Sequence, residues 1–286
     1  MHPPQAAWAR STSWWMIRAR LCEMRATWLT DLHLNFLKKE PLGRFLASVK
    51  REAPDMIFVT GDTAESHNLD YFLDQLRPIA PLYYVLGNHD FYGSSLAEVR
   101  RRARETGGWL PAMGPVRLTA ATMLVGVDGW GDARCGNLAS RIRLADWQWI
   151  RDLDTLMVCP PEHRAQALQA LGADEAGTLR AQLDTLEPSD ELIVLTHVPP
   201  FAEASWHNGK LSEPDWLPWF TCIAVGDVLL EYARRVPRTR ITVLCGHTHG
   251  RGEYRPCDNL LVRTGGWAPG ERDYGNPIVQ ASWSIP

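Results

Sequence analysis

The sequence predicts an α/β protein, because strand-like and helix-like segments alternate and the strands end in metal-binding side chains. Five short apolar runs have the composition of strands buried on both faces: 27–30, 56–60, 82–86, 192–195 and 241–245. Each run is followed within two residues by Asp or Asn, or by His. In open α/β sheets, ligands bind just beyond the C-terminal ends of the strands. The repeated arrangement therefore predicts a metal site.

Two helices are predicted between the first three strands. Segment 41–52 has apolar residues at helical spacing, namely Leu42, Phe45, Leu46 and Val49. Segment 68–76 has the same pattern, and Asn68 is predicted to cap its N-terminus.

A third helix is predicted from Ser95 to Thr106, and it contains the densest cationic run of the chain, 100–104. Glu98 and Glu105 are interspersed with these arginines, which favours a solvated helix face. A patch that recruits phosphate is the alternative.

A hairpin is predicted next, formed by 116–119 and 123–127, followed by a glycine-rich turn at 128–132. The two acids of this turn, Asp128 and Asp132, are predicted to be turn residues rather than metal ligands.

The residues that follow the five strands are oxygen and imidazole donors. They are Asp31, His33, Asp62, Asn88, His197, His247 and His249. No cysteine is among them, so the set suits Mn, Fe, Zn, Co or Ni and argues against an iron–sulfur cluster. Seven ligands are too many for one ion, which predicts two ions about 3.5–4 Å apart, bridged by a carboxylate. Each motif alone has an ordinary explanation as a turn, a cap or a core histidine, but their joint order favours the metal site.

The motif order D-x-H, GD, GNHD, H and GHTH, from Asp31 to His249, resembles that of the calcineurin-like metallophosphoesterases. The resemblance implies an α/β fold of four layers, α/β/β/α, with two mixed β-sheets flanked by helices. It also implies that Asp31, His33 and His249 hold one metal, that Asn88, His197 and His247 hold the other, and that Asp62 bridges them.

The resemblance implies catalytic roles for two further residues. His89 matches the histidine that protonates the leaving oxygen in this family. Glu65 stands where relatives with a GDxxD motif carry the acid that orients this histidine, so the same role is expected of Glu65.

A dinuclear metal-dependent phosphoesterase is the predicted function. A water that bridges two cations has a lowered pKa, so hydroxide is available near neutral pH to attack phosphorus in line. The metals and His89 would then absorb charge on the phosphoryl oxygens and the leaving group. The expected metals are Mn²⁺, Fe²⁺/Fe³⁺ or Zn²⁺, and phosphodiesterase capability is expected. The alternatives are a phosphomonoesterase acting on a small metabolite and a non-catalytic scaffold that retains the metal site.

Two segments outside the motif set, 133–187 and 199–220, are predicted to carry substrate specificity. The second contains Trp206, His207 and Lys210, which are candidate substrate contacts. It also contains Trp216 and Trp219. Together with Trp206, these rings either stack on a nucleobase or line an apolar pocket, or they cover the segment's own small core or a dimer contact.

Residues 1–23 are predicted to be a dispensable extension, with Met24 as the functional start, because the first strand begins there. An amphipathic element that docks on the body or on a partner is the alternative. Residues 24–286 are predicted to form a single domain that contains both specificity segments. The apolar stretch 14–17 is too short for a signal-peptide core or a membrane span.

The composition predicts a cytoplasmic enzyme with no membrane association, and the family resemblance implies a small phosphorylated substrate. The net charge is −3 and no long basic run occurs, which argues against a nucleic-acid partner. The six cysteines form no CxxC pair and no regular framework, which favours a reducing compartment.

Overall fold

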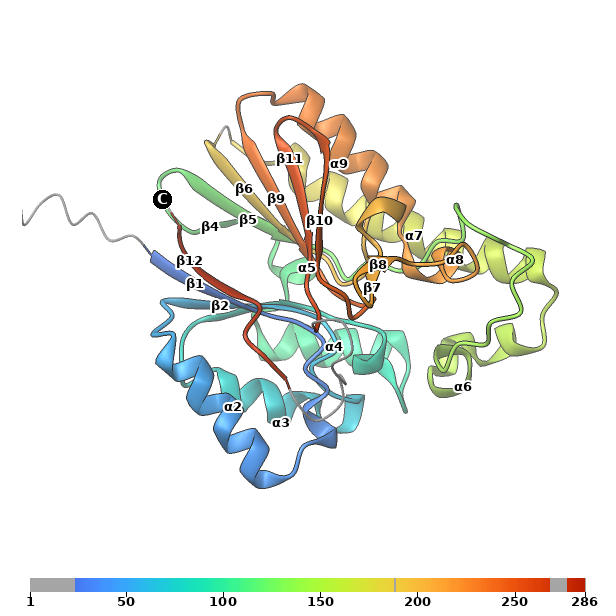
Figure 1. The fold of residues 1–286 in the computed structure, drawn as a ribbon, viewed down its shortest axis with the longest axis horizontal. Helices are drawn as coiled ribbons and strands as arrows, with labels where there is room; N and C mark the ends of the chain where they lie inside the picture. The colour runs from blue at the N-terminus through green and yellow to red at the C-terminus, as the bar shows by residue number, and fades with distance from the viewer. Residues whose placement is uncertain (1–23, 188, 268–276, 286) are drawn as a thin grey trace, which may run out of the picture.

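Two mixed β-sheets pack face to face and carry helices on their outer faces, as expected from the sequence (Figure 1). A computed structural model describes residues 24–187, 189–267 and 277–285. The smaller sheet has the order β12 (Ala281–Ile285), β1 (Met24–Leu29), β2 (Met56–Thr60), β3 (Leu82–Val85). The larger sheet has the order β10 (Gly252–Cys257), β11 (Leu260–Thr264), β9 (Arg240–Cys245), β6 (Glu191–Leu195), β5 (Thr122–Gly126), β4 (Val116–Arg117).

Strand periodicity explains the four layers, because alternate side chains point to opposite faces of a sheet. Trp28 of β1 and Phe58 of β2 pack against Leu195 of β6 in the core between the sheets. Leu29 and Val59, one residue further along, belong to the core under the helices of the smaller sheet. Both faces of these strands are buried, which explains their continuous apolar sequence.

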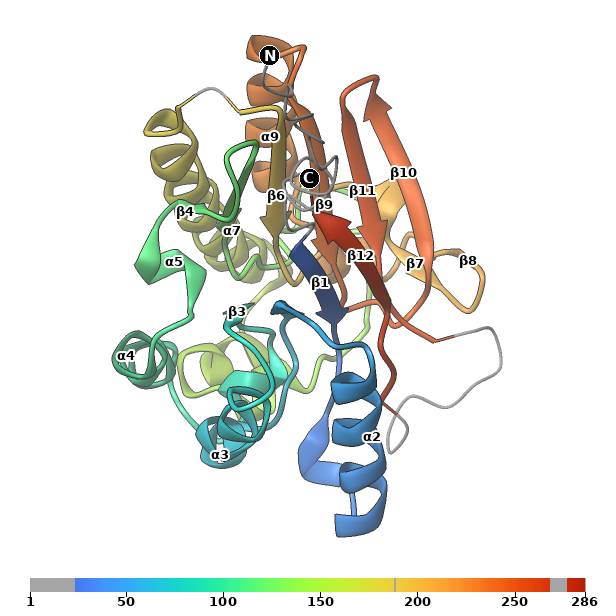
Figure 2. The same cartoon turned by 90° about the vertical axis from the view of Figure 1, so that its left-hand side faces the viewer.

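Helices cover the outer face of each sheet. The smaller sheet carries α2 (Lys39–Arg51), α3 (Ser66–Leu76) and α4 (Leu96–Thr106), and the larger sheet carries α7 (Pro161–Asp184) and α9 (Ile223–Arg235). Figure 2 shows the first three beside β1 and β3, and the other two beside β6. The helix α7 packs on α9 and β5, so the longest helix of segment 133–187 is a layer of the sandwich.

All five strands expected at the site and the hairpin β4–β5 are confirmed. The three helices expected up to Thr106 are also confirmed, and Ser95 caps α4 by accepting a hydrogen bond from the backbone N–H of Glu98 (3.3 Å). The predicted cap of α3 is wrong: the helix begins at Ser66, before Asn68, with Glu65 in the N-cap position. The backbone N–H of Glu65 donates to Asn35 Oδ1 (3.3 Å), and this tertiary contact fixes the earlier start.

Three strands near the C-terminus were not predicted. In the structure, β10 and β11 extend the larger sheet, and β12 pairs antiparallel with β1, with Met24 opposite Ile285. Polar residues interrupt β12, and its only neighbour in the sheet lies at the other end of the described chain. A local apolar pattern cannot reveal such a pairing.

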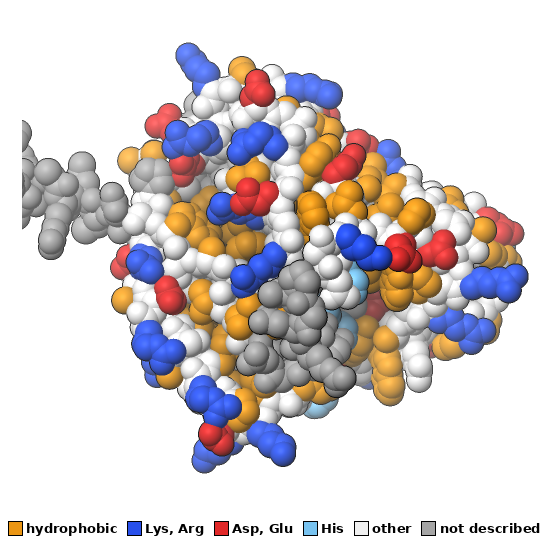
Figure 3. Space-filling model, viewed as in Figure 1, with side chains coloured by type: hydrophobic (Ala, Val, Ile, Leu, Met, Phe, Trp, Pro, Cys, Tyr) orange, Lys and Arg blue, Asp and Glu red, His pale blue; other side chains and the backbone are white. Residues whose placement is uncertain are grey.

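Segment 1–23, including Cys22, lies outside the described residues. The five cysteines that the structure describes are free thiols. Among the helices of the described chain, none is long and apolar enough to cross a membrane. On the face drawn in Figure 3, basic and acidic side chains are interspersed.

Candidate metal centre

Five loops converge where β1, β2, β3, β6 and β9 end, and they carry all seven predicted ligands. Backbone hydrogen bonds hold the loops together within each sheet, from Asp31 N to Gly61 O (3.1 Å) and from Gly246 N to His197 O (2.9 Å). The backbone N–H of His247 donates to Asp31 Oδ1 (2.9 Å), which joins the loops of the two sheets. The site is therefore assembled by the sandwich itself.

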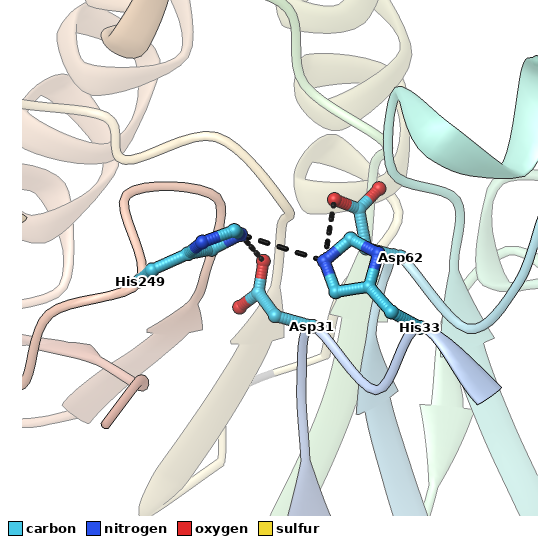
Figure 4. A group of neighbouring side chains, drawn as sticks. All are labelled: Asp31, His33, Asp62 and His249. Atoms are coloured by element: carbon cyan, nitrogen blue, oxygen red, sulfur yellow. Dashed lines mark hydrogen bonds and ion pairs between the residues drawn. The ribbon is translucent and has the colours of Figure 1, made fainter. Parts of the chain in front are cut away.

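One group of ligands consists of Asp31, His33, Asp62 and His249, whose donor atoms all lie within 4.8 Å of one another (Figure 4). His33 Nε2 lies 3.5 Å from His249 Nε2 and 3.7 Å from Asp62 Oδ2. His249 Nε2 lies 3.4 Å from Asp31 Oδ1. Two imidazoles and two carboxylates thus face a common point.

A second group lies beside the first and contains Asn88, His197 and His247. Asn88 Oδ1 lies 3.1 Å from His197 Nε2 and 3.0 Å from His247 Nδ1, and these two nitrogens are 3.2 Å apart. Asp62 Oδ1 lies 3.5 Å from His197 Nε2. Asp62 therefore presents one oxygen to each group.

This donor set fits divalent metal ions. The ring nitrogens of different histidines lie close to one another and to carboxylate oxygens. The lone pairs of these nitrogen and oxygen atoms therefore point toward shared positions. A cation at such a point is stabilised by every one of these donors, and mixed imidazole and carboxylate ligands suit Mn, Fe and Zn.

Strained backbone is concentrated at the ligands. Among the described residues, eight that are not glycine have positive φ, and five of these are predicted ligands: Asp31 (49°), His33 (45°), Asp62 (53°), His247 (69°) and His249 (58°). Such conformations cost on the order of 1–3 kcal/mol each and cluster at functional sites. The surrounding hydrogen bonds hold the donors in place before any ion binds.

Two glycines of the motifs are required by close approach. A Cβ atom at Gly87 would collide with Asp62 Oδ1, and one at Gly246 would collide with the Asp31 carboxylate. The glycines that precede Asn88 and His247 therefore leave room for ligands from other loops.

Burial determines the charge state of the ligands. Burial raises the pKa of Asp62 well above its usual value, and the nearby Asp31 and Asp90 raise it further. Burial also opposes ionisation of Asp31, but the hydrogen bond from His249 and the surrounding imidazoles bring its pKa below the usual value. Burial lowers the pKa of His33, His197 and His247, so these rings are neutral near pH 7, as metal ligation requires.

His89 lies at the floor of the site beside the first ligand group. Its ring packs edge-on against His33 (4.5 Å between centroids) and stacks on Tyr92 (4.2 Å, 29° between planes). Burial, together with His249 and His197, lowers the pKa of His89 to about 3. Glu65 is half-buried at the start of α3, and its role in orienting His89 stays a prediction.

Asp90, which the motif analysis left without a role, joins two of the ligand loops. Its carboxylate accepts hydrogen bonds from the backbone N–H groups of Asp62 (2.9 Å), Ala64 (3.0 Å) and Gly87 (2.8 Å). Burial raises its pKa to about 7. Asp90 therefore fixes the loop of Asp62 against the loop of Asn88.

Asp128, predicted to be a turn residue, connects several elements around the site. Its Oδ1 accepts hydrogen bonds from Leu86 N and Trp109 Nε1 (both 2.8 Å), and its carbonyl accepts from His197 N (2.7 Å). Arg100 Nε lies 3.4 Å from Asp128 Oδ2. One buried acid thereby supports the backbone before Asn88 and at His197.

The cationic run 100–104 divides into two parts. Arg101 pairs with Glu98 and Glu105 on the solvated face that was predicted. Arg100 instead lies in a buried ion-pair cluster with Asp128 and Glu175, whose Oε1 is 2.6 Å from Arg100 Nη2. For Arg100 the prediction was wrong, because its partners come from distant segments that local sequence does not reveal.

A cavity of about 550 Å³ opens above the ligands. His207 and Lys210 line it, as expected; His207 Nδ1 lies 2.9 Å from Thr248 O, and Lys210 pairs with Glu213 (3.0 Å). Trp206 is not among the lining residues, since its ring packs against Gly252. Whether these residues contact substrate stays a prediction.

Comparison with known proteins agrees with the fold and the motifs. A sequence model described as calcineurin-like phosphoesterase matches residues 24–251. An uncharacterized metallophosphoesterase from Aquifex aeolicus (strain VF5) is 29% identical over 132 residues, which cover 44% of this chain and 49% of that protein. The chain thus matches about half the length of this relative.

Two solved structures have the same fold. Phosphopantetheinyl hydrolase from Mycobacterium tuberculosis superposes with a TM-score of 0.61 at 15% identity, covering 88% of this chain and 95% of that chain. A dimetal phosphatase from Danio rerio superposes with a TM-score of 0.54 at 13% identity, covering 89% and 90%. At these identities the likeness concerns the fold.

Proposed function

Because the chain belongs to the calcineurin-like phosphoesterase family, whose members are metal-dependent hydrolases of phosphoric esters, we propose that it cleaves its ester at a dinuclear centre and accepts phosphodiesters. The observation that carries this proposal is the position of Asp62, with Oδ2 toward His33 and Oδ1 toward His197. A carboxylate placed between two sets of donors is suited to bridge two cations.

Two ions divide the ligands as the motifs predict. Asp31, His33 and His249 would hold one ion, and Asn88, His197 and His247 the other, with Mn²⁺, Fe²⁺/Fe³⁺ or Zn²⁺ as fitting metals. When bound, two cations supply positive charge that activates water as a nucleophile and stabilises the phosphoryl oxygens.

The protein's own contribution to proton transfer would come from His89, which lines the cavity next to His33. Its lowered pKa makes the ring neutral in the free protein. A neutral imidazole can donate an N–H hydrogen bond to a phosphoryl oxygen or the leaving oxygen. A bound phosphate ester brings negative charge beside the ring, which raises its pKa and favours proton donation.

Hydrolysis of a monoester of a small metabolite is the second candidate, and the rim of the cavity supports it. Arg143 is exposed to solvent and lines the cavity. A guanidinium in this position can pair with the extra negative charge that distinguishes a monoester from a diester. A small phosphorylated substrate and a cytoplasmic location remain part of both proposals.

Hydrolysis of bis(p-nitrophenyl) phosphate and of p-nitrophenyl phosphate separates these candidates. The protein would be stripped with a chelator and reloaded with Mn²⁺ before kcat/KM is measured for both esters. We expect a higher kcat/KM for the diester. Preference for the monoester would establish the second candidate. If neither ester is hydrolysed in a metal-dependent reaction, the remaining alternative is a non-catalytic scaffold that retains the metal site.

A further inference from the structure

We propose that the rim of the cavity is an aromatic subsite for the leaving group, and that the substrate is therefore an ester of an aromatic or flat apolar alcohol. The proposal rests on the proposed function and specifies its substrate class. The subsite consists of Phe220, Trp216 and Leu211, all of which line the cavity.

Aromatic rings lead from a metal ligand to the rim of the cavity. The ring of Phe220 packs edge-on against that of His247 (4.8 Å between centroids, 79°). Trp216 stacks on Phe220 (5.0 Å, 29°). A flat group bonded to a phosphate that sits over His247 would therefore pass directly along these rings.

Both outer members of the subsite are large apolar side chains left exposed in a concave surface. Trp216 is 38% exposed and Leu211 is 43% exposed. A ligand that covers them removes apolar surface from water, which favours binding. Exposed apolar groups within a cavity mark ligand sites more strongly than single ones on a convex surface.

The subsite is held rigidly by the neighbouring core. Trp219 N donates to Trp216 O (3.0 Å), and the Trp219 ring is buried against Trp147 (5.2 Å, 86°). The alternatives left open by the sequence are thus divided between two residues: Trp219 covers the core, and Trp216 lines the pocket.

The test compares 1-naphthyl phosphate with glycerol phosphate in the wild type, Trp216→Ala and Trp149→Ala. Trp149 is a matched control because it is 52% exposed and does not line the cavity. We expect Trp216→Ala to lower kcat/KM for the naphthyl ester by about tenfold and for glycerol phosphate by less than about threefold. Trp149→Ala should change neither value.

The outcomes separate this proposal from the proposed function. Equal losses for both esters in Trp216→Ala, or no loss for either, overturn the aromatic subsite while leaving a phosphoesterase. Absence of turnover of these monoesters and of bis(p-nitrophenyl) phosphate by the Mn²⁺-loaded wild type overturns both. Turnover of the diester alone moves the same comparison of variants to the methyl diesters of 1-naphthyl phosphate and glycerol phosphate. Mn²⁺ binding by Trp216→Ala, followed by calorimetry, shows whether the variant still has an intact metal centre.

Separate contacts carry a second inference: the structure assigns Asp146 as a positioning residue for the ligand Asn88. Asp146 is buried in the short helix α6 (Asp146–Trp149). Its Oδ1 accepts hydrogen bonds from Asn88 Nδ2 (2.8 Å) and from the hydroxyl of Tyr92 (2.6 Å).

The Asp146 carboxylate decides which end of the Asn88 amide faces the metal site. Only the amide oxygen can ligate a cation, whereas an unrestrained amide can turn either end toward it. Asp146 Oδ1 accepts the hydrogen bond from Asn88 Nδ2, so it holds the NH₂ group and directs Asn88 Oδ1 toward His197 and His247. The same carboxylate accepts from Tyr92, whose ring stacks on His89.

The test measures Mn²⁺ binding by calorimetry on the chelator-stripped protein. We expect Asp146→Asn to weaken the binding of one of the two ions by about 10–100-fold, because losing the hydrogen-bond partner that orients a metal ligand typically has this effect. Tyr92→Phe keeps the 2.8 Å hydrogen bond from Asn88 Nδ2 to Asp146 and removes only the longer one from Asn88 Nδ2 to the Tyr92 hydroxyl (3.2 Å), so it should change the affinity by less than about threefold. Wild-type affinity for both ions in Asp146→Asn would overturn the assignment.

A reciprocal exchange separates positioning from a purely structural role. The Asn88→Asp/Asp146→Asn double variant retains a hydrogen bond between the two positions and offers oxygen to the metal in either orientation. We expect it to bind both ions again. A folded double variant that binds only one ion overturns the assignment, whether or not Asp146→Asn folds alone.

Discussion

Replacement of Asp62 by Asn should lower kcat on every ester that the enzyme cleaves by about 10³-fold or more, since metal charge stabilisation is worth several kcal/mol. The Asp62 carboxylate is the group shared by the two ligand sets, so its loss weakens both. Asparagine keeps the shape of the side chain and removes its charge. Turnover and bound Mn²⁺ per chain should therefore fall together.

The same substitution should leave the metal-free protein as stable as the wild type, or more stable. Burial and the nearby acids Asp31 and Asp90 raise the pKa of Asp62 in the folded state. When folding raises the pKa of a carboxyl group, the free energy of unfolding of the protein falls as the pH rises from the usual pKa of the group to its pKa in the folded state. Metal-free wild type should thus lose stability relative to Asp62→Asn as the pH increases.

Thermal unfolding with and without Mn²⁺ measures this difference. Excess Mn²⁺ should raise the Tm of the wild type much more than that of Asp62→Asn, because only a bound ion stabilises the folded state. Asp227→Asn serves as the control, since Asp227 pairs with Arg134 on the surface. Metal-dependent turnover within about tenfold of the wild type in Asp62→Asn would show that the bridge is not required.

Replacement of His89 by Asn should lower kcat by about 10²–10⁴-fold for an ester with a poor leaving group, such as an alkyl phosphate. The loss should be much smaller for p-nitrophenyl esters, whose leaving oxygen needs little protonation. Mn²⁺ affinity should be retained, because His89 lies beside the ligands rather than among them.

The comparison of leaving groups identifies what His89 does. The pKa of His89 is lowered to about 3 in the free protein, so the ring acts as an acid only after substrate charge raises that pKa. An equal loss on alkyl and p-nitrophenyl esters would assign His89 to stabilising phosphoryl oxygens instead. His163→Asn, on the exposed start of α7, should change neither rate.

The ligand loops could be predicted because their information is local. Each strand is an unbroken apolar run, and the donor follows within two residues of its end. Parallel strands place their C-terminal ends on one edge of a sheet. The grouping of Asp31 with His249, which follow strands of different sheets, came from the family resemblance. The structure brings these predicted donors together in one centre.

The residues that hold the predicted ligands and their loops in place could not be predicted, because their interaction partners lie far away in the sequence. Asp146 and Asn88 are 58 residues apart, and Arg100 and Glu175 are 75 apart. Nothing near these positions distinguishes a buried acid from a solvated one. The start of α3 was misplaced for the same reason, since Asn35 fixes it from another loop.

The pairing of β12 with β1 has a consequence for the order in which the protein forms. The strand that leads to Asp31 and His33 is synthesised before β2, β3 and the whole larger sheet, but its edge is covered by β12, which follows all of them in the chain. Pairings between such distant segments are slow to form and leave earlier strands exposed meanwhile. A growing chain therefore has an unpaired sheet edge at β1 until β12 has been synthesised, and during this interval chaperone protection would matter most.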